Sequence, residues 1–163
     1  MHQAGEMREA TLEVPALEKY GEAVAVVPEG EDMTLEIRLE GLHEGILVTG
    51  LVTTNAVAEC VRCLDSFEFE LQVDFQELFA YSATQADSYT VVDDCVDLAD
   101  IIRDAVVLDL PFQPVCQPEC FGLDQATGEK RTEPWSGPES EVLDPRWQAL
   151  SELLESKPPE TTK

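Results

Sequence analysis

Phe67-Glu-Phe-Glu-Leu-Gln-Val-Asp-Phe75 alternates apolar and polar residues. Successive side chains of a β-strand point to opposite faces of a sheet, so this period of two predicts a strand with one buried face and one wet face. Such a strand is typical of an antiparallel sheet, because both faces of a parallel sheet are usually covered. The buried face would carry the side chains of Phe67, Phe69, Leu71, Val73 and Phe75.

Two further extended runs precede this strand. Residues 33–39 alternate in the same way, and residues 46–60 form a long run rich in β-branched side chains. Gly50 lies inside the long run, where a glycine often marks a bulge, so we expect the strand to bend there. Shorter strands are expected at residues 23–27 and 89–92.

Two helices are predicted after the sheet. The first covers residues 97–109, begins with Asp97 as a capping residue and ends before Pro111. Its apolar stripe comprises Leu98, Ile101, Ile102, Ala105 and Leu108. The second begins at Asp144-Pro145, a cap followed by proline at the first helical position. The predicted class is therefore α+β: a twisted antiparallel sheet of about four to six strands, one helix after it and one C-terminal helix.

The length of 163 residues fits one domain, and the hydrophobic content of 44% excludes wholesale disorder. We expect that domain at residues 33–156, after an acidic and partly irregular segment at 1–32 and before a disordered tail at 157–163. No apolar stretch is long enough to span a membrane. The first residues lack the basic and apolar regions of a secretory signal, so we expect a cytoplasmic protein.

Two closely spaced cysteine pairs, Cys60/Cys63 and Cys116/Cys120, are the main candidate site. Such pairs let two thiolates converge on one tetrahedral cation, and two pairs together can complete a structural zinc site. The alternative is four reduced thiols without a metal. A redox pair would instead open a helix, whereas Cys63 leads into a strand. The fifth cysteine, Cys95, is expected to be a small buried apolar residue.

Charge is the second strong feature. The chain has 34 acidic and 10 basic residues, a formal net charge of −24, and only Lys130 and Arg131 are adjacent cations. Nucleic-acid binding depends on cations that neutralise phosphates, so this chain should be repelled by bare RNA and by anionic membranes and should attract basic proteins. The alternative is that the acidity only keeps the protein soluble or reflects its host.

Catalysis has little support in the sequence. The two histidines are His2 and His43, and no glycine-rich phosphate loop, nucleophile elbow or zinc-binding helix motif occurs. We therefore expect a protein that is not an enzyme. A competing hypothesis is a zinc- or thiol-dependent enzyme, which would need a polar pocket with a base near the cysteines.

Several motifs together resemble the YceD family, also called the DUF177 domain. They occur in the family's order from about residue 35 to 155: Cys60–Leu64, Phe75–Phe79, Leu110–Cys116, Cys120–Leu123 and Asp144–Leu150. The chain departs from the family where many members carry two further cysteines, because Asp124 and Thr127 stand there, although Gly128 is kept. Asp124 is then a candidate oxygen ligand beside the four cysteines.

The resemblance implies a non-enzymatic role in the accumulation of large-subunit ribosomal RNA, meaning processing of the 23S precursor or subunit assembly. Direct RNA binding conflicts with the charge of −24. We therefore expect the partner to be a basic ribosomal protein or a large-subunit precursor, bound through an acidic surface. Direct binding to ribosomal RNA stays the alternative, and nothing in the sequence indicates the oligomeric state.

Overall fold

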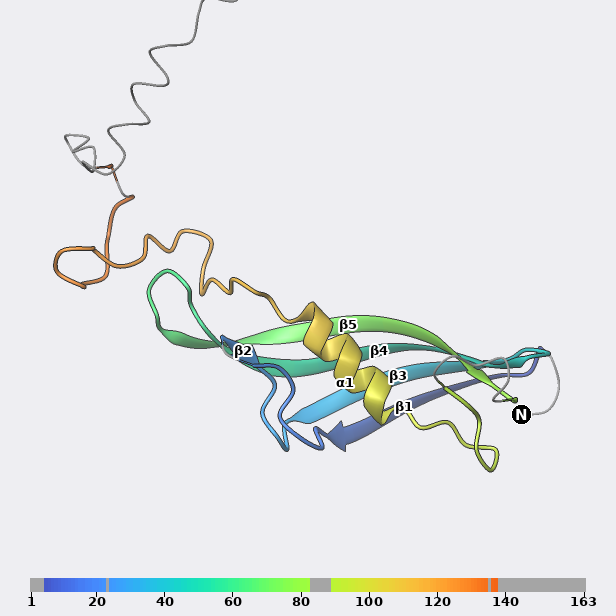
Figure 1. Cartoon of the computed structure of the whole chain (residues 1–163). Coiled ribbons are helices and arrows are strands. Elements are labelled where there is room, and N and C mark those ends of the chain that lie inside the picture. Colours follow the sequence, from blue (N-terminus) through green and yellow to red (C-terminus); the bar gives the residue numbers. More distant parts are fainter. Residues whose placement is uncertain (1–4, 23, 83–88, 135, 138–163) are drawn as a thin grey trace, which may run out of the picture. The chain divides into compact units, whose positions relative to one another are not determined.

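The computed structural model describes residues 5–22, 24–82, 89–134 and 136–137, and in them an antiparallel five-stranded sheet carries one helix on a face (Figure 1). The elements belong to one compact unit that ends at Thr132. This mainly β architecture confirms the predicted antiparallel sheet followed by a helix. The elements are β1 Met7–Pro15, β2 Ala25–Val26, β3 Asp32–Gly41, β4 Gly45–Glu59, β5 Ser66–Ala80 and α1 Ala99–Asp109.

β4 is the central strand of the sheet. It pairs with β5 along all 15 of its residues, from Gly45 opposite Ala80 to Glu59 opposite Ser66. On its other side β4 pairs first with β3 and then, near its end, with β2. β1 pairs with the far side of β3 and is the last strand there. The strand predicted at 67–75 is therefore confirmed and continues to Ala80.

β1 was not predicted, although it has nine residues and pairs throughout with β3. Both β1 and β2 lie in the acidic segment 1–32. Eight of the nine β1 residues are exposed because the strand lies at the sheet edge, so its sequence needs no clear apolar alternation. The strand expected at 89–92 is reduced to two isolated bridges, one between Thr90 and Ala80 and one between Val92 and Cys95.

The core lies between α1 and one face of the sheet, here called the inner face. Val48, Val52 and Phe79 are fully buried there, and α1 contributes Ile101, Ile102 and Val106. The predicted stripe was wrong for Leu108, which is 81% exposed at the margin of the helix face, whereas Val106 points into the core. Asp97 precedes the helix, and its carboxylate accepts a hydrogen bond from the Ala99 N–H at 3.0 Å.

Gly50 marks a close approach and not a bulge. The pairing of β4 runs through it without interruption, with Ile37 on one side and Phe75 on the other. A Cβ atom at Gly50 would lie 2.4 Å from the Phe75 ring. The glycine therefore provides the space in which a buried aromatic ring lies across β4.

Two predicted features, the helix from Asp144 and the tail at 157–163, lie outside the described residues. Within the described part of the chain, no helix has both the length and the apolar character needed to cross a membrane.

We expect Gly50→Ala to lower the free energy of unfolding by about 1–3 kcal/mol, because the added methyl overpacks the site occupied by Phe75. Alanine is otherwise better than glycine inside a strand, so a loss of stability would report the clash alone. Thr53→Ala, on the opposite face of the same strand, is the control and should change stability by less than about 0.5 kcal/mol. Urea unfolding measures both, and equal stability of the two variants would contradict the assignment.

Candidate metal centre

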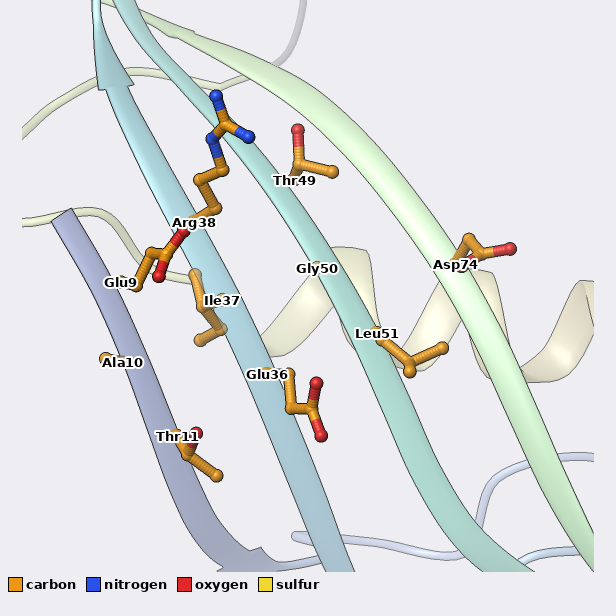
Figure 2. A pocket seen from close by; sticks show the side chains of 10 residues that line it. All are labelled: Glu9, Ala10, Thr11, Glu36, Ile37, Arg38, Thr49, Gly50, Leu51 and Asp74. Carbon is orange, nitrogen blue, oxygen red and sulfur yellow. The ribbon is translucent and has the colours of Figure 1, made fainter. Parts of the chain in front are cut away.

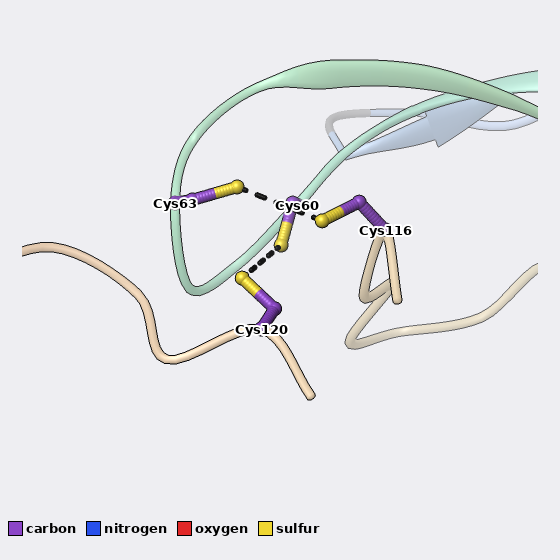
Figure 3. Close-up of side chains that lie close together, drawn as sticks. All are labelled: Cys60, Cys63, Cys116 and Cys120. Carbon is purple, nitrogen blue, oxygen red and sulfur yellow. Dashed lines mark hydrogen bonds between the residues drawn. The ribbon is translucent and has the colours of Figure 1, made fainter. Parts of the chain in front are cut away.

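The turn between β4 and β5 brings Cys60 and Cys63 together (Figure 3). The Cys60 N–H donates to the Asp65 carbonyl at 2.8 Å, and the Leu64 N–H donates to the Cys60 carbonyl at 2.8 Å. Leu64 has a φ of 60°, which lies in the left-handed region that tight turns require. The antiparallel pairing of the flanking strands therefore fixes this cysteine pair at one end of the sheet.

The segment after α1 carries the second pair to the same place. The Val61 N–H donates to the Pro114 carbonyl at 3.0 Å, which ties the turn to the segment ahead of Cys116. The Arg62 guanidinium donates to the Cys120 carbonyl at 2.9 Å. Gly122 then passes so close that a Cβ atom would lie 2.9 Å from the Arg62 carbonyl, with a φ of +79°.

The four sulfurs form a compact group. All of them lie within 4.8 Å of one another. The Cys60–Cys120 sulfur pair is 3.8 Å apart, and the Cys63–Cys116 pair is 3.7 Å apart. Four thiolates placed about 2.3 Å from one ion in tetrahedral geometry have sulfurs about 3.8 Å apart. The structure therefore brings the four predicted cysteines together at a spacing that could hold a metal ion.

The site is also shielded from water. Cys60, Cys63 and Cys120 are buried, and Cys116 is half-buried. Phe67, Val115 and Leu123 pack around them as a cluster separate from the main core. Low exposure strengthens metal–thiolate bonds and limits exchange with solvent.

One thiol of the group, that of Cys60, ionises at a lower pH than an ordinary cysteine. Burial disfavours the thiolate of Cys60, but backbone N–H groups that donate to its sulfur outweigh this and lower its pKa from 9.0 to about 6. These N–H groups belong to Cys116, Cys63 and Arg62.

Two other thiols, those of Cys63 and Cys116, resist ionisation in the absence of a cation. The Asp65 N–H favours the thiolate of Cys63, but burial and the neighbouring sulfurs raise its pKa to about 12. Burial and the Cys60 sulfur raise the pKa of Cys116 as well. The pocket therefore accommodates one negative charge readily, and a divalent cation is what would let all four sulfurs ionise.

Two basic side chains, Arg62 and Lys130, lie beside this sulfur cluster in an otherwise acidic protein. Lys130 forms an ion pair with Asp65, which raises the pKa of Lys130 and lowers that of Asp65, and the thiols of Cys63 and Cys116 raise the Lys130 pKa further. A zinc ion with four thiolates carries a net charge of about −2, which these cations would partly offset. Lys130 was not predicted, because no spacing in the sequence links it to the cysteines. Arg62 lies between Cys60 and Cys63, but its contact with the Cys120 carbonyl depends on where the segment after α1 passes.

Two predictions about other residues were wrong. Cys95 is exposed in a turn, where its N–H and carbonyl bond to Val92, and it is not a buried residue. Asp124 is not among the clustered ligands. Its carboxylate accepts bonds from the N–H groups of Thr127 and Ala126, which also lower its pKa.

An enzyme that used these cysteines would need an acid or a base near the thiols. A hollow of about 450 Å³ adjoins the cysteines, and its charged lining residues are Asp65, Glu119, Lys130 and Arg131. Asp65 and Lys130 are paired with each other. Among the described residues His43 is the only imidazole. It precedes β4 and Cys60 follows β4, so about 45 Å of strand separates the two.

We expect the metal-free protein to gain one thiolate as the pH rises through about 6, and Cys60→Ser to abolish that step. The folded pKa lies below the unfolded value, so this group stabilises the metal-free fold above about pH 9, and that stabilisation is lost as the pH falls through about 6. Ultraviolet thiolate absorbance against pH, after chelation, follows the titration. A first thiolate appearing above about pH 8 would contradict the assignment.

Comparison with known proteins gives a consistent set of matches. A family model described as "Large ribosomal RNA subunit accumulation protein YceD" matches residues 48–154, which include all four clustered cysteines. An uncharacterized protein of Mycobacterium tuberculosis is 41% identical over 152 residues, covering 88% of this chain and 72% of its own length.

More distant matches extend this set. An uncharacterized protein of Mycobacterium leprae is 37% identical over 158 residues, covering 92% of this chain and 72% of its own length. The uncharacterized protein YlbN of Bacillus subtilis is 28% identical over 116 residues, covering 63% of each chain. No solved structure matches the chain.

Proposed function

Because the chain belongs to the YceD family of large ribosomal RNA subunit accumulation proteins, we propose that it supports 23S ribosomal RNA processing or large-subunit assembly without catalysing a reaction. It acts by binding a basic ribosomal protein, or a large-subunit precursor that carries one. The observation that carries this mechanism is the distribution of charge on the sheet face opposite α1, here called the outer face.

Charge on the outer face is almost all negative. Partners in an antiparallel ladder share a face, so the registers of β1, β3, β4 and β5 decide which side chains lie there. Figure 2 views this face with α1 behind the strands. Arg38 is the single cation among its described strand residues. The carboxylates are those of Glu9, Glu13, Asp32, Glu36, Glu40, Glu59, Glu68, Glu70 and Asp74.

Several of these carboxylates are free to meet a partner. Arg38 pairs with Glu40, so it does not neutralise the others. Glu9, Glu36 and Asp74 border a shallow hollow of about 490 Å³ and form no ion pair within the described part of the chain (Figure 2). A surface of one sign speeds association with an oppositely charged protein and disfavours wrong partners.

The negative charge of the outer face argues against direct binding to RNA. Protein–RNA affinity rises with each phosphate that a lysine or arginine neutralises, and this face offers one arginine. Direct ribosomal RNA binding would therefore have to use another surface. An interaction that survives RNase treatment favours binding to a ribosomal protein, and one that RNase abolishes favours direct binding to ribosomal RNA.

The cysteine cluster fits a structural role in this proposal. We assign its ligands as Cys60, Cys63, Cys116 and Cys120 and its metal as zinc, held by four thiolates. Four protein ligands leave no open position for a substrate, which agrees with a protein that is not an enzyme. Free cysteines suit a reducing compartment, so we place the protein in the cytoplasm.

We expect tagged protein to recover large-subunit ribosomal proteins from cell lysate after RNase treatment. Replacing Glu9→Gln, Glu36→Gln and Asp74→Asn together should reduce that recovery by about tenfold, because each exposed ion pair contributes a factor of about two. Quantitative mass spectrometry of the captured proteins measures the change.

A matched control removes three exposed carboxylates elsewhere, with Glu44→Gln, Asp109→Asn and Glu119→Gln. This variant has the same net charge and should retain recovery. Equal losses in both triple variants would show that only total charge matters. Recovery that RNase abolishes would favour direct RNA binding, and a clean preparation without ribosomal material would overturn the proposal.

Protein purified without chelator should carry about one equivalent of zinc by elemental analysis. Cys116→Ser should release the metal and speed amide exchange in the segment after α1, while β4 and β5 stay protected, because the cluster ties that segment to the turn. Cys95→Ser is the control, since Cys95 is exposed and outside the cluster, and should leave the zinc content unchanged. Less than about a tenth of an equivalent of zinc in the wild type would contradict the metal assignment.

A further inference from the structure

β1 presents an open backbone edge. It is the last strand on its side of the sheet, and no described strand lies beyond it. Gly41 donates to the Glu6 carbonyl at 2.8 Å, and Ala16 donates to the Glu31 carbonyl at 2.8 Å. These two bonds show which residues of β1 direct their backbone N–H and C=O groups toward β3, because these groups alternate in direction along an antiparallel strand.

The bonds at Glu6 and Ala16 imply that even-numbered residues of β1 direct their backbone groups toward β3. Odd-numbered residues then direct their N–H and C=O groups away from the sheet. This edge comprises Met7, Glu9, Thr11 and Glu13, and ends at Pro15, which has no N–H. No described strand pairs with these four residues, and such a row of donors and acceptors is a template for another strand.

The two sides of this edge differ in chemistry. On the inner side an apolar groove of about 400 Å³ runs between β1 and the start of α1, lined by residues that include Leu12, Val14, Leu17, Leu35 and Leu98. Leu12 is 46% exposed and Leu17 is 71% exposed. On the outer side Glu9 and Glu13 project from β1 (Glu9 is drawn in Figure 2).

We propose that β1 accepts an additional β-strand from an extended segment of a basic partner protein, in which apolar residues alternate with lysine or arginine. Side chains of an added strand alternate between the two faces of the sheet. One set would fill the groove beside Leu12 and Leu17, and the other would lie over Glu9 and Glu13. This inference rests on the proposed function, and it names the docking mode and the sequence pattern of the basic partner.

A second copy of this chain fits the edge poorly. An antiparallel pair of β1 strands centred on Thr11 would place Glu9 of one copy opposite Glu13 of the other, and like charges directly opposite destabilise a sheet. Each copy also carries a net charge of −24. The charge on both sides of the contact therefore selects a basic occupant.

The probe is a synthetic peptide of nine residues, the length of β1, that alternates lysine and valine. A block peptide with the same five lysines and four valines, grouped by type, is the control for charge alone. We expect fluorescence anisotropy with the full chain to show about tenfold tighter binding of the alternating peptide. Equal affinity for both peptides would overturn strand addition in favour of unspecific attraction.

Variants at Thr11 test the backbone edge itself. Thr11→Pro removes an N–H that points away from β3, so the sheet keeps its internal ladder, and proline is tolerated on edge strands. It should weaken peptide binding by about tenfold, the order expected for a lost backbone hydrogen bond. Thr11→Val keeps the N–H and should bind as the wild type does. Thermal unfolding of both variants verifies that the fold is intact.

Amide exchange supplies a readout that does not depend on a variant. The bound alternating peptide should slow exchange of the Glu9, Thr11 and Glu13 amides and leave the neighbouring even-numbered amides unchanged, because these already bond to β3. Wild-type affinity of Thr11→Pro for the peptide, or a dimer through β1 that the peptide does not displace, would overturn the inference. The proposed function is judged separately, by RNase-resistant recovery of ribosomal proteins and its loss in the triple variant of the outer face.

Discussion

The pairing of β4 with β5 over fifteen residues is the constraint on which the rest of the structure depends. Every other described strand joins the sheet through β4 or through β3, which β4 also holds. A ladder of this length fixes the register, because a slip by one residue would move every apolar side chain to the opposite face. It also fixes where the connecting turn lies, and that turn carries Cys60 and Cys63.

The alternation that builds the core also produces the acidic surface. Phe67 to Phe75 places its apolar residues under α1, so the intervening residues must face the other way. Those residues are acidic or amide side chains, and the equivalent positions of β1 and β3 add further carboxylates. With one face of the sheet covered by the helix, the protein can present the other as a charged face without loss of core packing.

The cysteine cluster shows how the sheet organises a segment with few apolar anchors. The segment at Cys116 and the turn between β4 and β5 both orient backbone N–H groups toward the Cys60 sulfur, which stabilises one thiolate. A second negative charge is disfavoured at Cys63 and Cys116, as the raised pKa values of these two thiols show. Lys130, paired with Asp65, and Arg62, bonded to the Cys120 carbonyl, bring positive charge to the same region of an acidic protein.

The sequence by itself determined the three long strands, the helix after the sheet and the two cysteine pairs. Each of these rests on a local pattern: a period of two, an apolar helical stripe, or a spacing of two or three residues. Leu108 and Cys95 were misplaced because a local pattern cannot tell where a helix face or a turn meets its neighbours.

Tertiary structure alone decided β1, the role of Gly50 and the surroundings of the cysteines. β1 is a strand because β3 offers hydrogen-bond partners. Its residues are mostly exposed, so its sequence shows no clear apolar alternation that would predict a strand. The requirement for glycine at position 50 depends on Phe75, twenty-five residues away, because its ring lies against Gly50. Lys130 reaches Asp65 across 65 residues of chain. Such contacts join residues that are far apart in the sequence. They form only when the register of the whole sheet brings those residues together, so no local pattern predicts them.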